Sequence, residues 1–204
     1  MQVNQTNSLP AHPEKATLEG KNKILGFWFF IGSDVVLFAS LFGTYLGLKG
    51  STQGGPGPQD LFHLEYVALM TFILLLSSMT SVLGIKAMQR NDFARMQLWF
   101  WITILLGLAF LGLEIYEFYQ FVVHEGLGYT TSAFASAFYT LLGFHGAHVT
   151  FGVLWFATLL IRSRTQGINT YTAPKFYVAS LYWHFVDVVW VFVFTLVYLM
   201  GKVG

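Results

Sequence analysis

Tyr182-Trp183-His184-Phe185-Val186-Asp187-Val188-Val189-Trp190 lies inside an apolar run that is long enough to cross a membrane. Two of its residues, His184 and Asp187, are ionisable, and each such group costs about 2.5–3.5 kcal/mol when it enters hydrocarbon on membrane-insertion scales. Ionisable residues in spans are therefore rare and usually face the interior of a helix bundle. A helix that served only as an anchor would be filled with aliphatic residues, so this stretch predicts a membrane bundle with a polar interior.

The composition agrees with a membrane protein. Of the 204 residues, 55% are hydrophobic and only 10% are charged, whereas a soluble domain carries about 25% charged residues. The net charge of +1 provides no electrostatic surface for nucleic acid, so a nucleic-acid partner is not expected. The absence of cysteine excludes a disulfide framework, thiolate metal sites and cysteine-based catalysis.

Five apolar stretches predict membrane spans, since a helix of about 20 apolar residues crosses the hydrocarbon core. They are Ile24–Leu48, Leu64–Ile85, Gln97–Val123, Ala133–Ile161 and Phe176–Gly201. The first linker contains Gly54-Gly55-Pro56-Gly57-Pro58, which no helix tolerates. No internal repeat is visible. The predicted fold is an all-α integral membrane protein: a five-helix bundle over residues 24–201, preceded by a polar cytoplasmic tail over residues 1–23.

The amino-terminal tail carries no recognisable targeting or catalytic signal. It is polar, and the apolar run that follows is too long for the core of a signal peptide. His12-Pro13-Glu14 looks superficially like a fragment of a metal site. Because it lies in a polar segment that we expect to be mobile, we assign it no role.

Basic residues alternate between the two sides of the predicted spans. Nine of the eleven lie before the first span or in the second and fourth linkers: Lys15, Lys21, Lys23, Lys86, Arg90, Arg95, Arg162, Arg164 and Lys175. Only Lys49 and Lys202 fall on the other side. Cytoplasmic loops are enriched in Lys and Arg, so the pattern predicts a cytoplasmic N-terminus and a C-terminus outside.

Seven ionisable side chains lie within four of the spans: Asp34, Glu114, Glu117, His145, His148, His184 and Asp187. At 1.5 Å per residue, Asp34 is about ten residues into the first span and near the midplane, which is too deep for a short side chain to reach water. The other six form three pairs of spacing i, i+3, so both members of each pair share one helix face. The pattern predicts a polar seam inside the bundle.

Each pair also has other interpretations. Glu114 and Glu117 could be solvated at the outer membrane interface. His145 and His148 are expected to form hydrogen bonds to neighbouring helices. A more specific alternative is that the two histidines ligate a metal ion. A di-iron site would require Glu-x-x-His motifs from two helices and two further glutamates, which these pairs do not supply. Haem ligation is chemically allowed, but the spacing does not demand it.

We expect the histidines of these pairs to contact carboxylates or hydroxyls of other spans, because an unpaired polar group in hydrocarbon costs several kcal/mol. Asp34 is expected to be protonated or closely paired, with a histidine of the fourth span as its partner. Glycines in spans one, three and four should let helix backbones approach closely, and Gly43-x-x-x-Gly47 is a candidate packing motif. Ser77-Ser78 and Thr80-Ser81 can bond across helices or to their own backbone.

Four motifs, in order along the chain, resemble one family. They are Gly26-Phe27-Trp28 through Asp34-Val35-Val36-Leu37-Phe38, Glu114-Ile115-Tyr116-Glu117, Gly143-Phe144-His145-Gly146-Ala147-His148-Val149 and Trp183-His184-Phe185-Val186-Asp187-Val188-Val189-Trp190. They resemble the first matching span, the acidic pair, the penultimate span and the last span of subunit III of the haem–copper terminal oxidases. The resemblance covers about Lys23 to Gly201.

The resemblance implies a subunit without a redox centre, without a catalytic residue and without a bound metal. Subunit III packs against subunit I, which carries haem and copper, in a complex that also contains subunit II. It holds phospholipids in a cleft and is thought to support proton uptake and stable turnover. Longer members have seven spans. This chain matches the last five, as do many bacterial members, where subunit I can carry the missing pair. The implied location is the bacterial cytoplasmic membrane.

Two positions bear on the family pattern. At Asp34 the family usually has a glutamate that reacts with carbodiimide, and aspartate keeps the acid but shortens its reach by one methylene. Arg162 resembles a family contact to a phospholipid head group, although it also reads as an ordinary cytoplasmic anchor.

Three functions remain to be distinguished. The runs Gln97–Glu117 and Tyr171–Ser180 look most similar to cytochrome c oxidase members, which favours an accessory subunit of a proton-pumping cytochrome c oxidase. A quinol-oxidising enzyme shares the architecture, and a copper-binding cysteine pair in subunit II would distinguish the two. The third possibility is a free-standing proton or ion transporter, which would favour repeats or broken spans, and neither is evident.

Overall fold

The computed structural model describes residues 10–203, apart from the side chain of Asp60. Residues 1–9 of the predicted tail and Gly204 lie outside the described residues. All regular structure in the described part is helical, and five helical runs are long and apolar enough to cross a membrane. The fold-class prediction is confirmed, while the orientation of the termini stays a prediction.

The long helices are joined by short linkers. They are α1 (Leu18–Leu48), α3 (Leu64–Gln89), α4 (Phe93–Val123), α5 (Ala133–Gln166) and α6 (Ala173–Val193). The last run continues through a π-helical stretch η2 (Phe194–Leu199) into α7 (Met200–Val203). A short 3₁₀ turn η1 (Pro13–Lys15) precedes α1, and one helical turn α2 (Pro58–Leu61) precedes α3.

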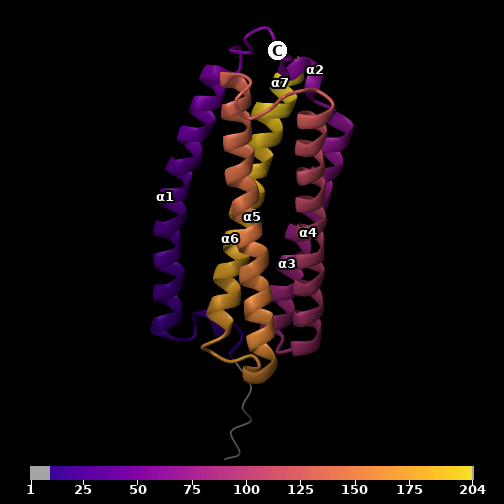
Figure 1. The fold of residues 1–204 in the computed structure, drawn as a ribbon. Coiled ribbons are helices and arrows are strands. Elements are labelled where there is room, and N and C mark those ends of the chain that lie inside the picture. Colours follow the sequence, from indigo (N-terminus) through magenta and orange to yellow (C-terminus); the bar gives the residue numbers. More distant parts are fainter. Residues whose placement is uncertain (1–9, 204) are drawn as a thin grey trace, which may run out of the picture.

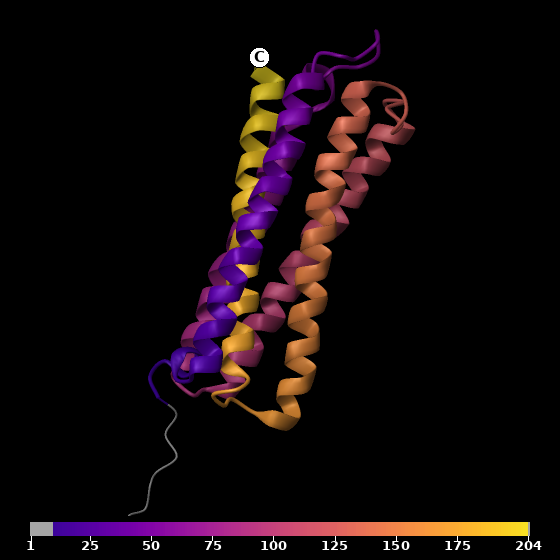
Figure 2. The same cartoon turned by 90° about the vertical axis from the view of Figure 1, so that its left-hand side faces the viewer.

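Four of the long helices form a square, and the fifth leans against it. Helix α4 packs on α3 and α5, and α6 packs on the same two helices from the opposite corner. Helix α1 contacts α5 and α6 and lies on the side of the bundle away from α3 and α4 (Figure 1). Figure 2 shows α1 running along the bundle next to the last helical run. The outer face of α1 is consequently exposed along most of its length.

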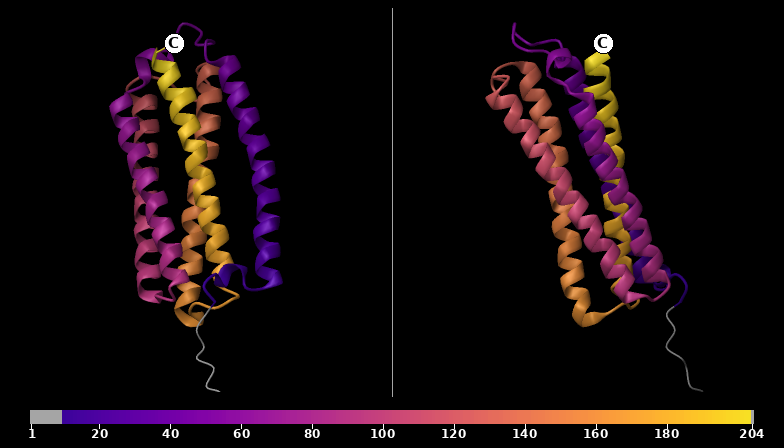
Figure 3. Two further views of the ribbon diagram at one scale, coloured as in Figure 1. Left: turned by 180° about the vertical axis from the view of Figure 1, so that it is seen from behind. Right: turned by 90° about the vertical axis from the view of Figure 1, so that its right-hand side faces the viewer.

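The helices extend beyond the apolar runs mainly at one end of the bundle, and at the other end only the last run is longer, by the two residues after Gly201. At the end that holds α2 and the C-terminus (Figures 1 and 3), the observed bounds match the predicted ones at Leu48, Leu64, Val123 and Ala133. At the opposite end, five helices extend three to six residues beyond the predicted spans. Hydropathy marks only the apolar part of a helix, whereas its end is set by caps such as Asp92 Oδ1, which accepts from Arg95 N at 3.0 Å.

Pro13 and Glu14 are buried against the bundle, whereas we expected His12-Pro13-Glu14 to lie in a mobile tail. Glu14 is buried and accepts a 3.2 Å hydrogen bond from Gln89 Nε2 at the end of α3. A Cβ on Gly20 would lie 2.6 Å from the Glu14 carbonyl oxygen, so the turn that joins η1 to α1 is tight. The segment therefore connects α1, α3 and α6 at one end of the bundle, a role that its sequence did not indicate.

Candidate functional site

The seven predicted polar side chains lie in three separate clusters. Asp34 and His148 meet between α1 and α5, His184 and Asp187 face α3, and Glu114, Glu117 and His145 lie among α4, α5 and the last helical run. Five of the seven are buried: Asp34, Glu114, Glu117, His145 and Asp187. Within the described residues no hydrogen bond or ion pair joins one cluster to another, so the structure divides the predicted seam.

Asp34 pairs with a histidine of the fourth long helix, the partner expected from the sequence. Its Oδ2 lies 3.6 Å from His148 Nε2, which is an ion-pair distance and too long for a hydrogen bond. The ring of His148 packs edge-on against Phe38 of α1, with centroids 4.9 Å apart. Tyr182 of α6 donates a 3.1 Å hydrogen bond to the His148 carbonyl oxygen. The pair thus lies where α1, α5 and α6 meet.

The protonation of the pair follows from its geometry. His148 Nδ1 lies 2.7 Å from the Phe144 carbonyl oxygen, and because a carbonyl can only accept, Nδ1 carries a proton. Nε2 then faces Asp34 either as a neutral acceptor opposite a protonated acid or as a charged donor opposite a carboxylate. In both forms the pair is electrically neutral as a whole, which reduces its cost in hydrocarbon.

The second cluster joins α3 and α6 through hydroxyl groups. Ser78 Oγ lies 2.6 Å from His184 Nδ1, and Ser180 Oγ lies 3.5 Å from His184 Nε2. Ser81 and Ser180 share a 2.8 Å hydrogen bond between the same two helices. Asp187 is buried one turn further along α6, and in the described residues neither of its carboxyl oxygens has a hydrogen-bond partner. Of the two roles open to the α3 hydroxyls, Ser78 and Ser81 bond across helices, while Ser77 and Thr80 also bond to the backbone of α3.

Two tryptophans of the last-span motif are also fixed to α3. Trp183 Nε1 donates to Ser77 Oγ, and Trp190 Nε1 donates to Thr71 Oγ1, both at 2.9 Å. Their spacing of seven residues, two helical turns, places both indoles on one face. That spacing, together with the hydroxyl residues of α3, could have predicted from the sequence that both indoles donate to α3.

The third cluster contains the acidic pair of α4. Tyr198, in the π-helical stretch η2, donates a 2.7 Å hydrogen bond to Glu117 Oε2. Glu114 lies one turn away, with its carboxyl group against the backbone of α5 at Gly146. Both side chains are buried, which contradicts the interpretation that the pair is solvated at the membrane interface. Tyr198 was not identified from the sequence, because the π-helical turn that directs it has no clear sequence signature.

His145 does not have the hydrogen-bond partner that we expected. Its ring is fully buried, and in the described part of the chain neither ring nitrogen has a hydrogen-bond partner. The ring lies against aromatic neighbours, with its centroid 5.2 Å from that of Trp190 and 5.8 Å from that of Phe110. Ring packing in this site takes the place of the predicted polar contact.

Glycine has different roles in different helices. A Cβ on Gly107 of α4 would lie 2.7 Å from Trp183, and one on Gly152 of α5 would lie 2.9 Å from the same indole. Those two glycines, like Gly146, permit the close approach that the sequence predicted. On α1, in contrast, a Cβ on Gly43 or Gly47 would meet nothing within 4 Å. The Gly43-x-x-x-Gly47 motif is therefore not used for packing within this chain.

Arg162 lies near the C-terminal end of α5, beside a pocket of about 200 Å³. Lys175 lines the same pocket, together with the hydroxyl residues Ser163 and Thr172. The Lys175 ammonium also lies 3.7 Å from the centroid of the Tyr171 ring, and the hydrogen bond from Lys175 lowers the pKa of the Tyr171 phenol. Two cations and two hydroxyls around one hollow form a suitable site for an anion.

The donor set offers little to a metal ion. In residues 10–203, with the side chain of Asp60 excepted, no group of three or more His, Cys, Asp or Glu side chains converges as metal ligands. The histidines that could ligate a metal instead contact a carboxyl group, hydroxyls or aromatic rings of neighbouring helices. The arrangement can hold helices together and keep polar groups away from lipid.

These features define a multi-pass membrane protein with a polar, hydrogen-bonded interior. A family model described as cytochrome c oxidase subunit III matches residues 7–202. The chain belongs to the cytochrome c oxidase subunit III family.

Curated relatives cover nearly the whole chain. It is 65% identical to a cytochrome c oxidase subunit 3 of Bacillus sp. strain PS3, over 97% of this chain and 95% of the relative. It is 61% identical to a protein of the same name from Alkalihalophilus pseudofirmus, over 99% of this chain and 98% of the relative. A quinol oxidase subunit 3 of Bacillus subtilis is 48% identical, over 91% and 90%.

Proposed function

We propose that the chain is an accessory subunit of a bacterial aerobic respiratory oxidase that oxidises cytochrome c. The observation that carries this proposal is its similarity over almost the full length to relatives named cytochrome c oxidase subunit 3, at 61% and 65% identity. Similarity to relatives named quinol oxidase subunit 3 is lower, at 48% identity. The subunit would lie in the cytoplasmic membrane and pack against subunit I, in a complex that includes subunit II.

In this proposal the chain performs no redox chemistry and contributes no catalytic residue. Haem and copper would be held by the partner subunits. Support comes from how the chain uses its own polar groups: His148 faces Asp34, His184 faces Ser78, and Glu117 accepts from Tyr198. Groups committed to contacts between helices stabilise a scaffold. The scaffold would support proton uptake and sustained turnover of the proton-translocating enzyme.

We further propose that Arg162 contacts a phospholipid phosphate from the cytoplasmic leaflet. Arg162 and Lys175 line one pocket, and Ser163 and Thr172 add hydroxyl groups. Arginine and lysine bind phosphate through charge-assisted hydrogen bonds. The position of the pocket at the end of α5 places it near the level of the head groups, given the predicted orientation.

Purification of the full chain tests the proposed function. A carboxy-terminal affinity tag on the chain should recover a complex with the absorption spectrum of haem and with oxygen consumption driven by reduced cytochrome c. If the complex were to consume oxygen with a quinol and not with cytochrome c, the quinol oxidase alternative would hold. A haem-free chain that transports ions by itself in vesicles would contradict the proposal.

A further inference from the structure

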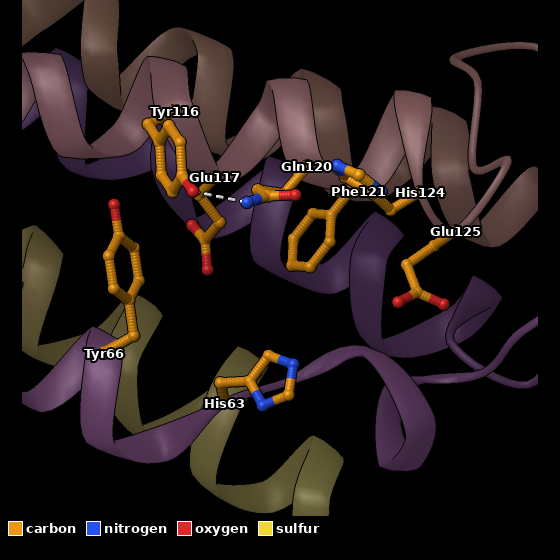
Figure 4. A pocket seen from close by; sticks show the side chains of 8 residues that line it. All are labelled: His63, Tyr66, Tyr116, Glu117, Gln120, Phe121, His124 and Glu125. Atoms are coloured by element: carbon orange, nitrogen blue, oxygen red, sulfur yellow. Dashed lines mark hydrogen bonds between the residues drawn. The ribbon is translucent and has the colours of Figure 1, made fainter.

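A pocket of about 370 Å³ lies between α3 and α4 at the end of the bundle that holds the C-terminus. The charge pattern predicts that this end faces outside. Figure 4 shows side chains of α4 and of the segment that enters α3 around a common space. The volume falls in the range of small-ligand pockets, about 300–1,000 Å³. This pocket is remote from Arg162, which lies at the opposite end of α5.

Glu117 forms the buried part of this pocket. The residue is only 5% exposed, and its carboxylate points into the space bounded by Tyr66 and His63 (Figure 4). Tyr198 donates to Oε2, and no other side chain or backbone group of the described residues donates to this carboxylate. Oε1 is therefore available to a ligand. A carboxylate oxygen that faces a pocket and has no donor can accept a charge-assisted hydrogen bond from a bound cation.

The charges around the pocket have one sign. Its wall contains a second carboxylate, Glu125, which is exposed at the mouth, and contains no lysine or arginine. Two histidines, His63 and His124, complete the polar rim. A ligand that neutralises these carboxylates must be positively charged.

The shape and the aromatic rings favour an organic cation over a metal ion. The volume of about 370 Å³ is far larger than a bare ion, and no set of three or more metal-ligating side chains converges in the described residues. The rings of Tyr66 and Tyr116 flank the pocket with centroids 6.3 Å apart. Tyrosine faces attract ammonium groups, and the Gln120 side chain adds polar atoms beside them.

We propose that this pocket binds a primary ammonium group. The ammonium would donate to Glu117 Oε1 and interact with Glu125 at the mouth, against the tyrosine rings. The head group of an aminophospholipid from the outer leaflet is the expected source, since Ile115, Tyr119 and Val122 on the adjoining face of α4 are exposed. This binding goes beyond the proposed accessory function and does not depend on it.

The test measures lipid binding to the full-length chain, purified with the subunits that accompany it. After delipidation, native mass spectrometry would follow binding of phosphatidylethanolamine, phosphatidylcholine and phosphatidylglycerol. The variants are Glu117→Gln and Glu125→Gln, and the control is Glu65→Gln, a change of the same charge at an exposed position outside the pocket. Glutamine retains an acceptor for Tyr198, and Glu125→Gln leaves the buried part of the pocket untouched.

We expect phosphatidylethanolamine binding to fall about tenfold in both pocket variants, the loss that follows removal of one charge-assisted hydrogen bond. Binding in the control should be unchanged. Phosphatidylcholine, whose quaternary ammonium cannot donate, should bind more weakly. If free ethanolamine binds with the same dependence on Glu125 and the lipid does not, the site still takes an ammonium but from a soluble source. Binding of phosphatidylethanolamine that is equal in all variants, or equal to that of phosphatidylcholine, would overturn the proposal.

Discussion

The carboxyl group of Glu114 lies in space that α5 leaves open only because residue 146 is glycine. A Cβ placed on Gly146 would be 2.6 Å from Glu114 Oε2, a distance at which one of the two groups must shift. Glu114 is buried, and its Oε1 has no hydrogen-bond partner in the described residues. The position of the Glu114 carboxyl group therefore depends on steric fit against the histidine motif of α5 and not on a hydrogen bond to it.

Gly146→Ala should consequently destabilise the bundle. Overpacking by one methyl group in a tight interior costs about 1–3 kcal/mol. The measurement is thermal unfolding of the purified protein in detergent, followed by tryptophan fluorescence. Gly143→Ala is the matched control on the same helix, because a Cβ there meets nothing within 4 Å. Equal stability of the two variants would show that Glu114 moves away at no cost.

How far the sequence predicts this structure depends on the scale of the feature. Apolar length identifies the five spans, because it reports directly on the thickness of the bilayer. The side of each linker stays a prediction from the basic residues. A histidine of the fourth span was the expected partner of Asp34, and His148 occupies that position. Features that the bilayer imposes directly, such as the length of a span, can thus be predicted from the sequence.

Contacts that depend on helix rotation could not be predicted in the same way. His145 and His148 share one motif, yet one packs against Trp190 and the other faces Asp34. Periodicity places both on one face but does not reveal which neighbouring side chain is long enough to reach them. Tyr198 reaches Glu117 from a π-helical turn, whose extra residue changes the direction of the side chains that follow it.

The Trp183–Ser77 hydrogen bond should contribute measurably to stability. Its length is 2.9 Å, and both side chains are buried between α3 and α6. Hydrogen bonds between membrane helices average about 0.6 kcal/mol and reach about 1.7 kcal/mol in double-mutant cycles. A cycle of Trp183→Phe and Ser77→Ala should give a coupling free energy of unfolding in that range. If the two single changes have strictly additive effects on the free energy of unfolding, the hydrogen bond contributes nothing to stability.

The orientation of the bundle can be tested directly. Nine of the eleven Lys and Arg residues lie at the end of the bundle where α1, α4 and α6 begin and where α3 and α5 end. The positive-inside rule predicts that this end is cytoplasmic. A periplasmic-type reporter fused to the C-terminus should be active, and one fused within the α3–α4 linker should not. The reverse activities would show that the orientation was assigned wrongly.

Asp34→Asn should affect the durability of the complex more than its chemistry. The change removes the carboxyl group that faces His148 and leaves a side chain of the same size, so α1 should dock less tightly on α5. If the pair contributes about 1 kcal/mol, retention of the chain in the purified complex should fall about fivefold. Initial oxygen consumption and proton ejection should stay near the parent values, because Asp34 acts in this interpretation as a contact between helices. Both rates would be followed over many turnovers in reconstituted vesicles, with Ser33→Ala, an exposed neighbour on α1, as the control. Immediate loss of proton ejection in a complex that still contains the chain would identify Asp34 as a proton carrier instead.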